Sequence, residues 1–355
     1  MLSDGLGSGV KANILATLTA EIAATMLERG NTVDEVVETL AATLPECQVR
    51  RLTYATFAVL QVLHGREAYL VEYDTPPLIL IRNNDVVELP MTERMVAGRA
   101  IRERQFMLEE GDYMVMLSDG YIHAGVGGLY RLGWGWKNIA VAARRWVATR
   151  GDAHQLTRAL SQTCLKLYNG TPGDDATVVS MWVRQARTAT IVTGPPADPK
   201  LDSLMVSKLM SAEGVKAICG GTTAQMAARE LGQELVVEWQ PRSKSPSSSS
   251  PSKIPPIARL KGVDLVTEGV LTLSSAAEQL RKAETIHDLP PAQDAGTRLA
   301  RLLLEADEIH FIVGNAINPH QLADVVRGKP MRLIYLDEVI GQLKRRNKLI
   351  TVEHL

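Results

Sequence analysis

Cysteine is scarce in this sequence, with three residues among 355. Cys47, Cys164 and Cys219 are odd in number, far apart in the chain and not in the paired spacing of a metal-binding motif. Secreted domains held by disulfides use many closely spaced cysteines, whereas a reducing compartment keeps thiols free. The scarcity excludes a disulfide framework, and we expect a cytoplasmic protein.

A surplus of charge of either sign is also missing: 39 Lys and Arg stand against 40 Asp and Glu, a formal net charge of −1. A broad basic face for nucleic acid or anionic membrane needs an excess of Lys and Arg. We find no apolar run that approaches the roughly 20 residues needed to span a bilayer. The first residues also lack the basic-then-apolar pattern of a signal peptide. The sequence therefore predicts partners other than nucleic acid or membrane.

The length predicts two domains, because 355 residues exceed what one ordinary core accommodates. Hydrophobic residues make up 45% and charged residues 22%, the mix of a soluble globular chain. The pattern changes near residues 184–200, which indicates a first domain at 1–186 and a second at 187–355. From Pro241 to Pro256, Ser and Pro supply twelve of sixteen residues. Such a segment cannot bury a core and predicts a disordered insertion at 241–256, inside the second domain.

The first domain groups its strand patterns together and sets its helix patterns apart. Apolar residues at helical spacing, with a Thr-x-x-Glu capping box at Thr32 and Glu35, predict helices over Val10–Arg29 and Thr32–Leu44. Short β-rich segments predict strands over Tyr54–Leu63, Ala68–Tyr73, Leu78–Ile81, Val86–Leu89 and Ala176–Val183. Helical spacing returns over Trp136–Arg150 and His154–Tyr168. This grouping predicts an α+β domain.

The second domain alternates strand and helix patterns instead. Strands are predicted near Ile191–Thr193, Ala217–Cys219, Leu235–Glu238, Val263–Thr267, Ile309–Val313 and Arg332–Leu336. Helices are predicted near Leu201–Met210, Thr222–Leu231, Leu273–Lys282 and Arg298–Leu304. Such alternation predicts an α/β, Rossmann-like domain with an open, mostly parallel sheet and helices on both faces.

One pentapeptide, Met-Leu-Ser-Asp-Gly, occurs twice, at Met1–Gly5 and at Met116–Gly120. The second copy ends an apolar run, so its Asp is expected at the end of a buried strand, where Gly lets the chain turn. A third acidic turn, Gly173-Asp174-Asp175, precedes another predicted strand. Carboxylates that converge on one sheet edge suit Mg²⁺ or Mn²⁺. A single Asp-Gly pair is more often a plain turn, and sequence alone leaves open whether the three turns meet.

Three ordered motifs carry a resemblance to a known family. They are Ser3-Asp4-Gly5-Leu6-Gly7-Ser8-Gly9-Val10-Lys11-Ala12, Met116-Leu117-Ser118-Asp119-Gly120 and Gly173-Asp174-Asp175-Ala176-Thr177-Val178-Val179. In order, spacing and context they resemble the signatures of the bacterial stage II sporulation protein E-like metal-dependent serine/threonine phosphatases, within the PPM superfamily. The resemblance covers about residues 1–185.

The resemblance implies a four-layer α-β-β-α sandwich and a hydrolase that removes phosphate from phosphoserine or phosphothreonine with two Mn²⁺ or Mg²⁺ ions. By resemblance, Asp4, Asp119 and Asp174 are catalytic metal ligands; Asp4 bridges both ions and the Gly5 carbonyl binds one of them. Asp175 is the weaker candidate, which orients the turn or binds outer water. The implied substrate is a phosphorylated regulatory protein of the anti-sigma-factor-antagonist type, in a signalling pathway. The helix pair that follows Asp4 forms either the outer layer of the sandwich or, as in relatives, a homodimer contact.

The sequence departs from the family at its beginning. Family members have two strands and a further acidic turn before the first signature, whereas Asp4 is the fourth residue here. If the chain starts at Met1, we expect the sandwich to lack these N-terminal strands and part of its metal site. The alternative to an active enzyme is then a catalytically impaired signalling module that binds partners.

Three loops of the second domain suggest a site for a small anionic ligand. Cys219–Thr223, Thr267–Gly269 and Gly314–Asn318 each follow a predicted strand, and ligands of such sheets bind at the carboxyl ends of strands. Free amides at a helix start hold anions. The candidate binding residues are Gly220, Gly221, Thr222, Thr223, Glu268 and Asn315. Gly and Thr are also ordinary helix-start residues, so each loop alone is a weak signal. A protein that acts through this ligand is a further alternative function.

Overall fold

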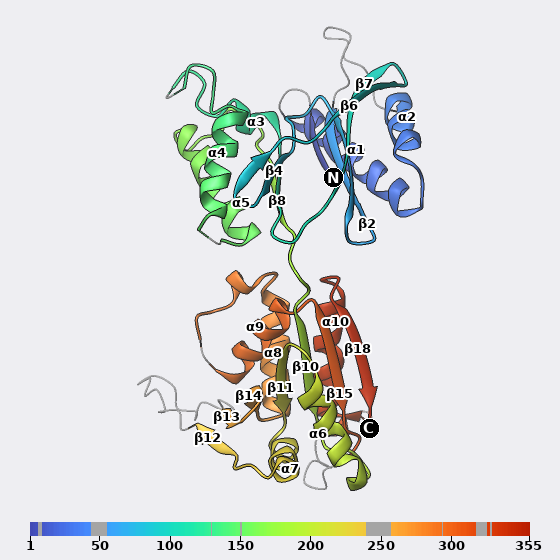
Figure 1. Cartoon of the computed structure of the whole chain (residues 1–355), viewed down its shortest axis with the longest axis vertical. Helices are drawn as coiled ribbons and strands as arrows, with labels where there is room; N and C mark the ends of the chain where they lie inside the picture. Colours follow the sequence, from blue (N-terminus) through green and yellow to red (C-terminus); the bar gives the residue numbers. More distant parts are fainter. Residues whose placement is uncertain are drawn as a thin grey trace. The chain divides into compact units, whose positions relative to one another are not determined.

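The computed structural model describes residues 1–5, 9–43, 55–128, 130–149, 151–238, 257–292, 294–316, 325–326 and 329–355. The predicted Ser/Pro insertion at 241–256 and Cys47 lie outside the described residues. The chain divides into two compact units, Met1–Gln185 and Ala186–Leu355 (Figure 1).

The first unit contains two antiparallel sheets. The five-stranded sheet has the order β1 (Leu2–Gly5), β2 (Ala55–Leu63), β3 (Glu67–Tyr73), β7 (Arg99–Met107) and β6 (Thr92–Val96). The four-stranded sheet has the order β5 (Asp85–Val87), β4 (Ile79–Arg82), β8 (Tyr113–Leu117) and β9 (Val178–Trp182). The sequence patterns missed β6 and β7, because their residues are mostly polar or charged.

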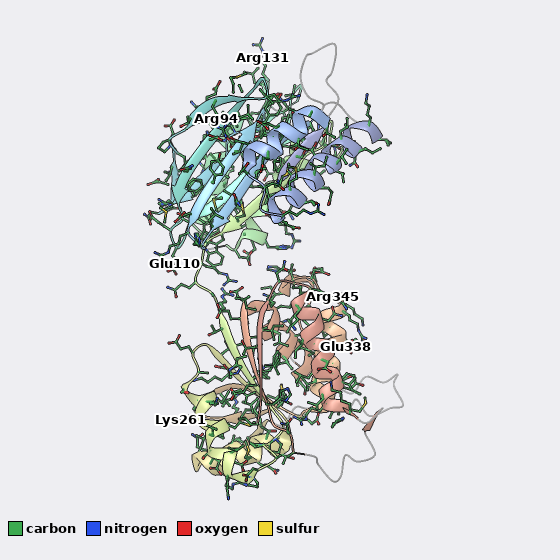
Figure 2. All side chains as sticks on the ribbon, turned by 90° about the vertical axis from the view of Figure 1, so that its right-hand side faces the viewer. Arg94, Glu110, Arg131, Lys261, Glu338 and Arg345 are labelled. Atoms are coloured by element: carbon green, nitrogen blue, oxygen red, sulfur yellow. The ribbon has the colours of Figure 1, made fainter. Side chains whose placement is uncertain are left out.

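Helices cover the outer face of each sheet. Helices α1 (Val10–Glu28) and α2 (Val33–Thr43) pack on the five-stranded sheet, and Figure 2 shows them across its face. Helices α4 (Trp136–Val147) and α5 (Ala153–Leu167) pack on the four-stranded sheet. A third core lies between the sheets and contains Leu2, Ala58, Leu70, Leu80, Met114 and Met116. The first unit therefore has the four-layer α-β-β-α arrangement that was predicted.

Helix α1 corrects one expectation from the sequence. Its 19 residues are long and apolar enough to cross a membrane by length and composition alone, so the statement that no apolar run approaches that length was too broad. In the structure, Ala12, Leu15, Thr19 and Ala23 form the buried face of the helix, and Leu15 and Ala23 belong to the core against the five-stranded sheet. The helix is thus an outer layer of the sandwich.

A buried acid holds the segment that joins the two sheets. The side chain of Glu72 on β3 is 1% exposed and accepts a hydrogen bond of 2.7 Å from the amide of Leu78, just before β4. It forms ion pairs with Arg104 and, at 3.6 Å, with Arg102, both on β7. Removing one partner of such a buried pair is strongly destabilising, so we assign Glu72 a structural role.

The second unit is built on one seven-stranded sheet. Its order is β12 (Val236–Glu238), β13 (Ile257–Leu260), β14 (Val263–Thr267), β11 (Val215–Cys219), β10 (Thr188–Thr193), β15 (Glu308–Val313) and β18 (Leu349–His354). The five strands from β14 to β18 in this order are parallel, whereas β12 and β13 pair in the antiparallel sense. A short hairpin of β16 (Val325–Val326) and β17 (Lys329–Pro330) stands apart from the sheet.

Helices pack on both faces of this sheet. One face carries α6 (Asp202–Ser211) and α7 (Gly221–Leu231), and the other carries α8 (Val270–Lys282), α9 (Ala295–Glu305) and α10 (Met331–Lys344). The single-turn 3-10 helices η1 (Pro199–Leu201) and η2 (Ile286–Asp288) lie in connections. Glu338 on α10, labelled in Figure 2, forms an ion pair of 2.9 Å with Arg281 on α8.

The strand predicted at Arg332–Leu336 is wrong, because this segment begins helix α10. Its run of Leu, Ile, Tyr and Leu has high β-propensity, but Leu336, Val339 and Leu343 recur at helical spacing and are buried together in the core. Tertiary packing thus overrides local propensity. The last parallel strand is instead β18, at Leu349–His354.

Candidate metal centre

The first acidic residue, Asp4, lies on strand β1. Asp4 is opposite Thr56 of β2, and Leu2, two residues earlier on the same face of the strand, is buried between the sheets. A Cβ atom added to the next residue, Gly5, would lie 2.3 Å from the carbonyl oxygen of Ala12. Only glycine at position 5 therefore lets helix α1 approach the strand so closely.

The second acidic residue, Asp119, follows a strand whose five residues are all buried. Ser118 has an extended backbone, and Asp119 is the first residue of the short helix α3 (Asp119–Ile122). The two copies of the pentapeptide thus adopt different structures: Ser3-Asp4-Gly5 continues strand β1, whereas Asp119-Gly120 opens a helix. The expectation that each Asp-Gly forms a turn directly after its strand is corrected for the first copy.

The third acidic turn interlocks with the second. The amide of Ser118 donates a 3.0 Å hydrogen bond to the carbonyl of Thr177, and the amide of Thr177 donates one of 2.9 Å to the Ser118 hydroxyl. A Cβ atom on Gly120 would lie 2.3 Å from the carbonyl oxygen of Asp175. The hydroxyl of Tyr168, just after α5, donates a 2.7 Å hydrogen bond to the Gly120 carbonyl. This role of Tyr168 was not predictable from local sequence, because the contact joins segments 48 residues apart.

The three acidic segments share one electrostatic environment. The carboxyl groups of Asp4 and Asp119 lie close enough for a hydrogen bond between them to contribute to the pKa of Asp4. Burial, then this hydrogen bond and the charges of Asp119 and Asp174, raise the pKa of Asp4 to about 7, although the Gly5 amide opposes the shift. Like charges brought together disfavour ionisation of one of them. The structure therefore places the carboxyl groups of Asp119 and Asp174 near enough to raise the pKa of Asp4.

These residues fit a hard divalent cation by their chemistry. A cation would offset the mutual repulsion that raises the pKa of Asp4, and carboxylate oxygens are the ligands that Mg²⁺ and Mn²⁺ prefer. Among the described residues, no three acidic, histidine or cysteine side chains lie close enough together to hold a metal ion. Asp174 would therefore have to approach Asp4 and Asp119 on binding. Asp175 is exposed, and its amide donates a 2.9 Å hydrogen bond to the Asp174 carboxylate, so it supports Asp174 through its backbone.

Removing the charge of Asp4 is expected to stabilise the metal-free first unit at neutral pH. Native Asp4 keeps its proton up to a pKa of about 7, against 3.8 for the ordinary carboxyl. The free energy of unfolding should therefore fall as the pH rises through this window. Asp4→Asn mimics the protonated form, so it should match the wild type near pH 4 and exceed it by about 1–2 kcal/mol at pH 8, since water screens the partly exposed carboxyl.

Urea denaturation of the metal-free chain, followed by tryptophan fluorescence, measures this difference, because four of the five tryptophans lie in the first unit. Asp85→Asn is the control, since Asp85 is highly exposed and only pairs with Arg144 at 3.2 Å. Added Mn²⁺ should raise the free energy of unfolding of the wild type by more than that of Asp4→Asn. An Asp4→Asn variant that is less stable than the wild type at pH 8 without metal would contradict this electrostatic account.

The predicted binding loops of the second unit lie at the carboxyl ends of its parallel strands. Glu268 is occupied within the protein: its carboxylate accepts hydrogen bonds from the amides of Val270 and Leu271, at 3.3 and 2.9 Å, and caps α8. Asn315 is tied to the end of the chain, because its amide bonds the Leu355 carbonyl at 2.8 Å. Residues 317 and 318 of the third loop lie outside the described residues.

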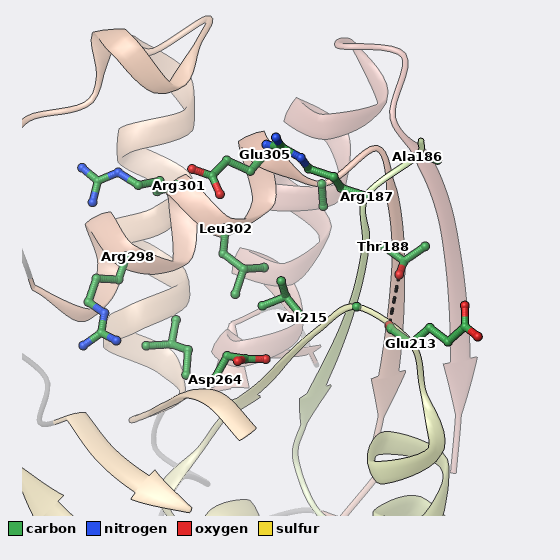
Figure 3. Close-up of a pocket in the computed structure, with 13 residues that line it drawn as sticks. Ala186, Arg187, Thr188, Glu213, Val215, Asp264, Arg298, Arg301, Leu302 and Glu305 are labelled. Atoms are coloured by element: carbon green, nitrogen blue, oxygen red, sulfur yellow. Dashed lines mark hydrogen bonds between the residues drawn. The ribbon is translucent and has the colours of Figure 1, made fainter. Parts of the chain in front are cut away.

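A pocket of about 530 Å³ lies at the opposite ends of these strands, where β10, β11 and β14 begin (Figure 3). Figure 3 shows Arg298 and Arg301 of α9 on one side and Asp264 below them, with Glu305 near Arg187. This pocket was not predictable from the sequence, because no motif marks the starts of these strands. Its acids alternate with its arginines, so its charge favours neither an anion nor a cation.

Comparisons with known proteins identify the family to which the first unit is similar. The sequence profile of the family described as stage II sporulation protein E (SpoIIE) matches residues 1–184. No curated protein matches the chain significantly. The phosphatase domain of the cell fate determinant SpoIIE from Bacillus subtilis, presoaked with Mn, is 15% identical, with a TM-score of 0.33, over 50% of this chain and 77% of that chain.

Two further solved structures are similar at this level. The SiaA-PP2C domain of Pseudomonas aeruginosa is 18% identical, with a TM-score of 0.41, over 51% of this chain and 72% of that chain. The RsbU and RsbW domains of a Mycobacterium tuberculosis protein are 19% identical, with a TM-score of 0.41, over 73% of this chain and 71% of that chain. The family profile spans more than half of the 355 residues and includes all three acidic segments. The chain therefore belongs to the SpoIIE family of PPM phosphatases.

Proposed function

We propose that this chain is a metal-dependent protein phosphatase that hydrolyses phosphoserine or phosphothreonine. The observation that carries the proposal is the electrostatic coupling of Asp4 to the nearby carboxylates of Asp119 and Asp174. Carboxylates that repel one another are costly to the fold, and a divalent cation between them offsets that cost. Family membership supports the same chemistry.

In this proposal Asp4, Asp119 and Asp174 hold two Mn²⁺ or Mg²⁺ ions, with the Gly5 carbonyl as a further ligand. When bound, such ions lower the pKa of water and offset charge on a phosphoryl group. The chain positions the ligands: Gly5 allows helix α1 to close on Asp4, and Gly120 allows the Asp175 backbone to pack against Asp119's helix. Tyr168 holds the same helix through the Gly120 carbonyl.

We also propose that the substrate is a phosphorylated regulatory protein and that the second unit is a Rossmann-like sensory domain. The support is indirect: one similar structure contains RsbU and RsbW domains, and another is PppA, a key regulatory component of T6SS in Pseudomonas aeruginosa. The mostly parallel sheet of the second unit, with helices on both faces, is of the kind that binds small ligands at its strand ends.

A catalytically impaired signalling module is the second candidate. The observation that favours it is the lack, in the described part of the chain, of three acidic side chains close enough to hold a metal ion. Such a module would bind its phosphorylated partner without releasing phosphate.

Hydrolysis separates the two candidates. The full chain is incubated with a phosphoserine peptide and with p-nitrophenyl phosphate, in Mn²⁺ and in chelator. The phosphatase proposal expects phosphate release that depends on Mn²⁺ from both compounds. No release from either compound in Mn²⁺ would favour the impaired module, whereas equal release with and without Mn²⁺ would contradict the metal-dependent phosphatase.

A further inference from the structure

Glycines meet at the carboxyl ends of four parallel strands in the second unit. Gly194 follows β10, Gly220 follows β11, Gly269 comes shortly after β14, and Gly314 follows β15. A Cβ on Gly269 would lie 3.4 Å from the Cα of Gly220, and one on Gly220 would lie 3.9 Å from the nitrogen of Gly194. A Cβ on Gly314 would lie 2.3 Å from the Gly194 carbonyl oxygen. Four backbone segments thus pack closely together at this edge of the sheet, which only residues without a Cβ allow.

Two helices begin at this edge of the sheet, and only one has a side-chain cap. At the start of α8, the Glu268 carboxylate accepts bonds from the amides of Val270 and Leu271. Helix α7 has Gly220 at its N-cap, and no side chain of the described residues accepts a hydrogen bond from its first-turn amides. The first-turn amides of an 11-residue helix such as α7 carry a partial positive charge and are ready to bind an anion.

An unpaired hydroxyl lies at the same helix start. Thr223, in the first turn of α7, is 1% exposed, and its Oγ1 has no hydrogen-bond partner among the described residues. The hydroxyl faces Gly220, because a Cβ on Gly220 would lie 2.8 Å from it. A buried hydroxyl without a partner costs free energy, and a ligand oxygen at this uncapped helix start would supply the missing partner.

A buried arginine on helix α10 lies next to the same glycines. Arg332, near the start of α10, is 9% exposed, and its guanidinium donates to the carbonyls of Thr193, at 2.5 Å, and Gly314, at 2.8 Å. Within the described ranges no carboxylate pairs with it, and burial lowers its pKa. The guanidinium fills the space beside Gly194, between β10 and β15: a Cβ added to Gly194 would lie 1.8 Å from its Nη1 atom. The strand order reverses there, which is where such sheets bind ligands.

We infer that this edge of the second unit binds the phosphoryl group of a small phosphorylated molecule. The first-turn amides of α7 and the Thr223 hydroxyl bind its oxygens, and Arg332 supplies positive charge across Gly194. These donors outnumber the two oxygens of a carboxylate and suit the three oxygens of a phosphate monoester. The site is separate from the metal centre, so it stands whether or not the phosphatase is active.

Isothermal titration calorimetry of the full chain tests the inference. Metal is first removed with a chelating resin, so that phosphate cannot bind to metal in the first unit. A resin also leaves no soluble chelator that could contribute heat to the titration. The probes are inorganic phosphate, adenosine monophosphate and O-phosphoserine, with acetate and citrate as carboxylates. We expect binding of at least one phosphate probe. Thr223→Val should weaken that binding by about tenfold, the effect of one hydrogen bond to a charged group.

Thr272→Val is the matched control. Thr272 is also in the first turn of its helix, fully buried, and without a partner for Oγ1 in the described part of the chain, but its helix α8 is capped by Glu268. Both variants should keep or raise the melting temperature without probe, and Thr272→Val should bind the probe like the wild type. The inference is overturned if no phosphate probe binds, if carboxylates bind as tightly as phosphates, or if the two variants bind alike.

Discussion

Asp119→Asn is expected to lower Mn²⁺-dependent phosphate release by at least about a thousandfold, which corresponds to several kcal/mol of lost transition-state stabilisation. The substitution keeps the shape of the side chain and removes the charge that a cation requires. Asp119 is exposed and opens helix α3 through its backbone, so the fold should survive. Loss of its charge near Asp4 should even stabilise the metal-free protein at neutral pH, because it removes repulsion between the two carboxylates. Initial rates on a phosphoserine peptide at saturating Mn²⁺ measure the effect.

Two further variants serve as comparisons for Asp119→Asn. Asp85→Asn removes an exposed acid far along the chain and should keep full activity, because its ion pair with Arg144 is exposed. Asp175→Asn should cost less than Asp119→Asn, since the structure assigns Asp175 a backbone role beside Asp174. An Asp119→Asn protein that is folded and as active as the wild type would remove Asp119 from the metal centre.

Gly120→Ala is expected to destabilise the first unit by about 2–3 kcal/mol, as overpacking of a tight contact does, and to lower turnover as well. The new Cβ would lie 2.3 Å from the carbonyl oxygen of Asp175 and 3.1 Å from the Cα of Ala176. Both atoms are backbone, so the third acidic segment must move away from the second. That movement separates Asp174 from Asp4 and Asp119. Urea denaturation and the Mn²⁺ concentration for half-maximal rate are the two readouts.

Gly128→Ala is the matched control for this variant. Gly128 lies in the loop after α3, where a Cβ would lie 3.5 Å from the Gly125 carbonyl oxygen, an ordinary contact. This change should alter stability by less than about 0.5 kcal/mol, as surface substitutions usually do. If Gly120→Ala needs no more Mn²⁺ than the wild type, the close packing of the two acidic segments does not serve metal binding.

Local signals in the sequence predicted the elements that depend on local chemistry. Thr32 and Glu35 form the expected capping box, with hydrogen bonds of 2.7 Å from the Thr32 amide to the Glu35 carboxylate and 3.3 Å in return. Helices α4 and α5 begin within one residue of their predicted starts, because apolar spacing at period 3.6 continues through them. Segments with a strong, uniform pattern were thus predictable.

Elements whose conformation depends on distant partners were not predictable. Strands β6 and β7 carry mostly polar residues, and the pairing of β7 with β3 decides their structure. The segment at Arg332–Leu336 has strand-like residues but packs as a helix. The two copies of Met-Leu-Ser-Asp-Gly differ for the same reason, since β1 pairs with β2 while Gly120 packs against Asp175.

In the candidate site, the acidic residues were predictable from the sequence, whereas the contacts that support them were not. Sequence order identified Asp4, Asp119 and Asp174 as acids of interest, and in the structure Asp119 and Asp174 lie near enough to Asp4 to raise its pKa. The supporting contacts of Tyr168 and Ser118 cross long stretches of chain and left no sequence signal. In the second unit, the loop glycines were recognisable, but Arg332 reaches them from a segment that was predicted as a strand.

The most direct test of the account is the binding of Mn²⁺ to the full chain, measured by calorimetry and by electron paramagnetic resonance. The account predicts that the wild type binds a pair of ions whose spectrum shows coupling between them, and that Asp119→Asn loses this spectrum. It also predicts weaker binding below a pH of about 7, because Asp4 must lose its proton before it binds the metal. Wild-type protein that binds Mn²⁺ no more tightly than Asp119→Asn would contradict the assignment of the three acidic segments as one metal centre.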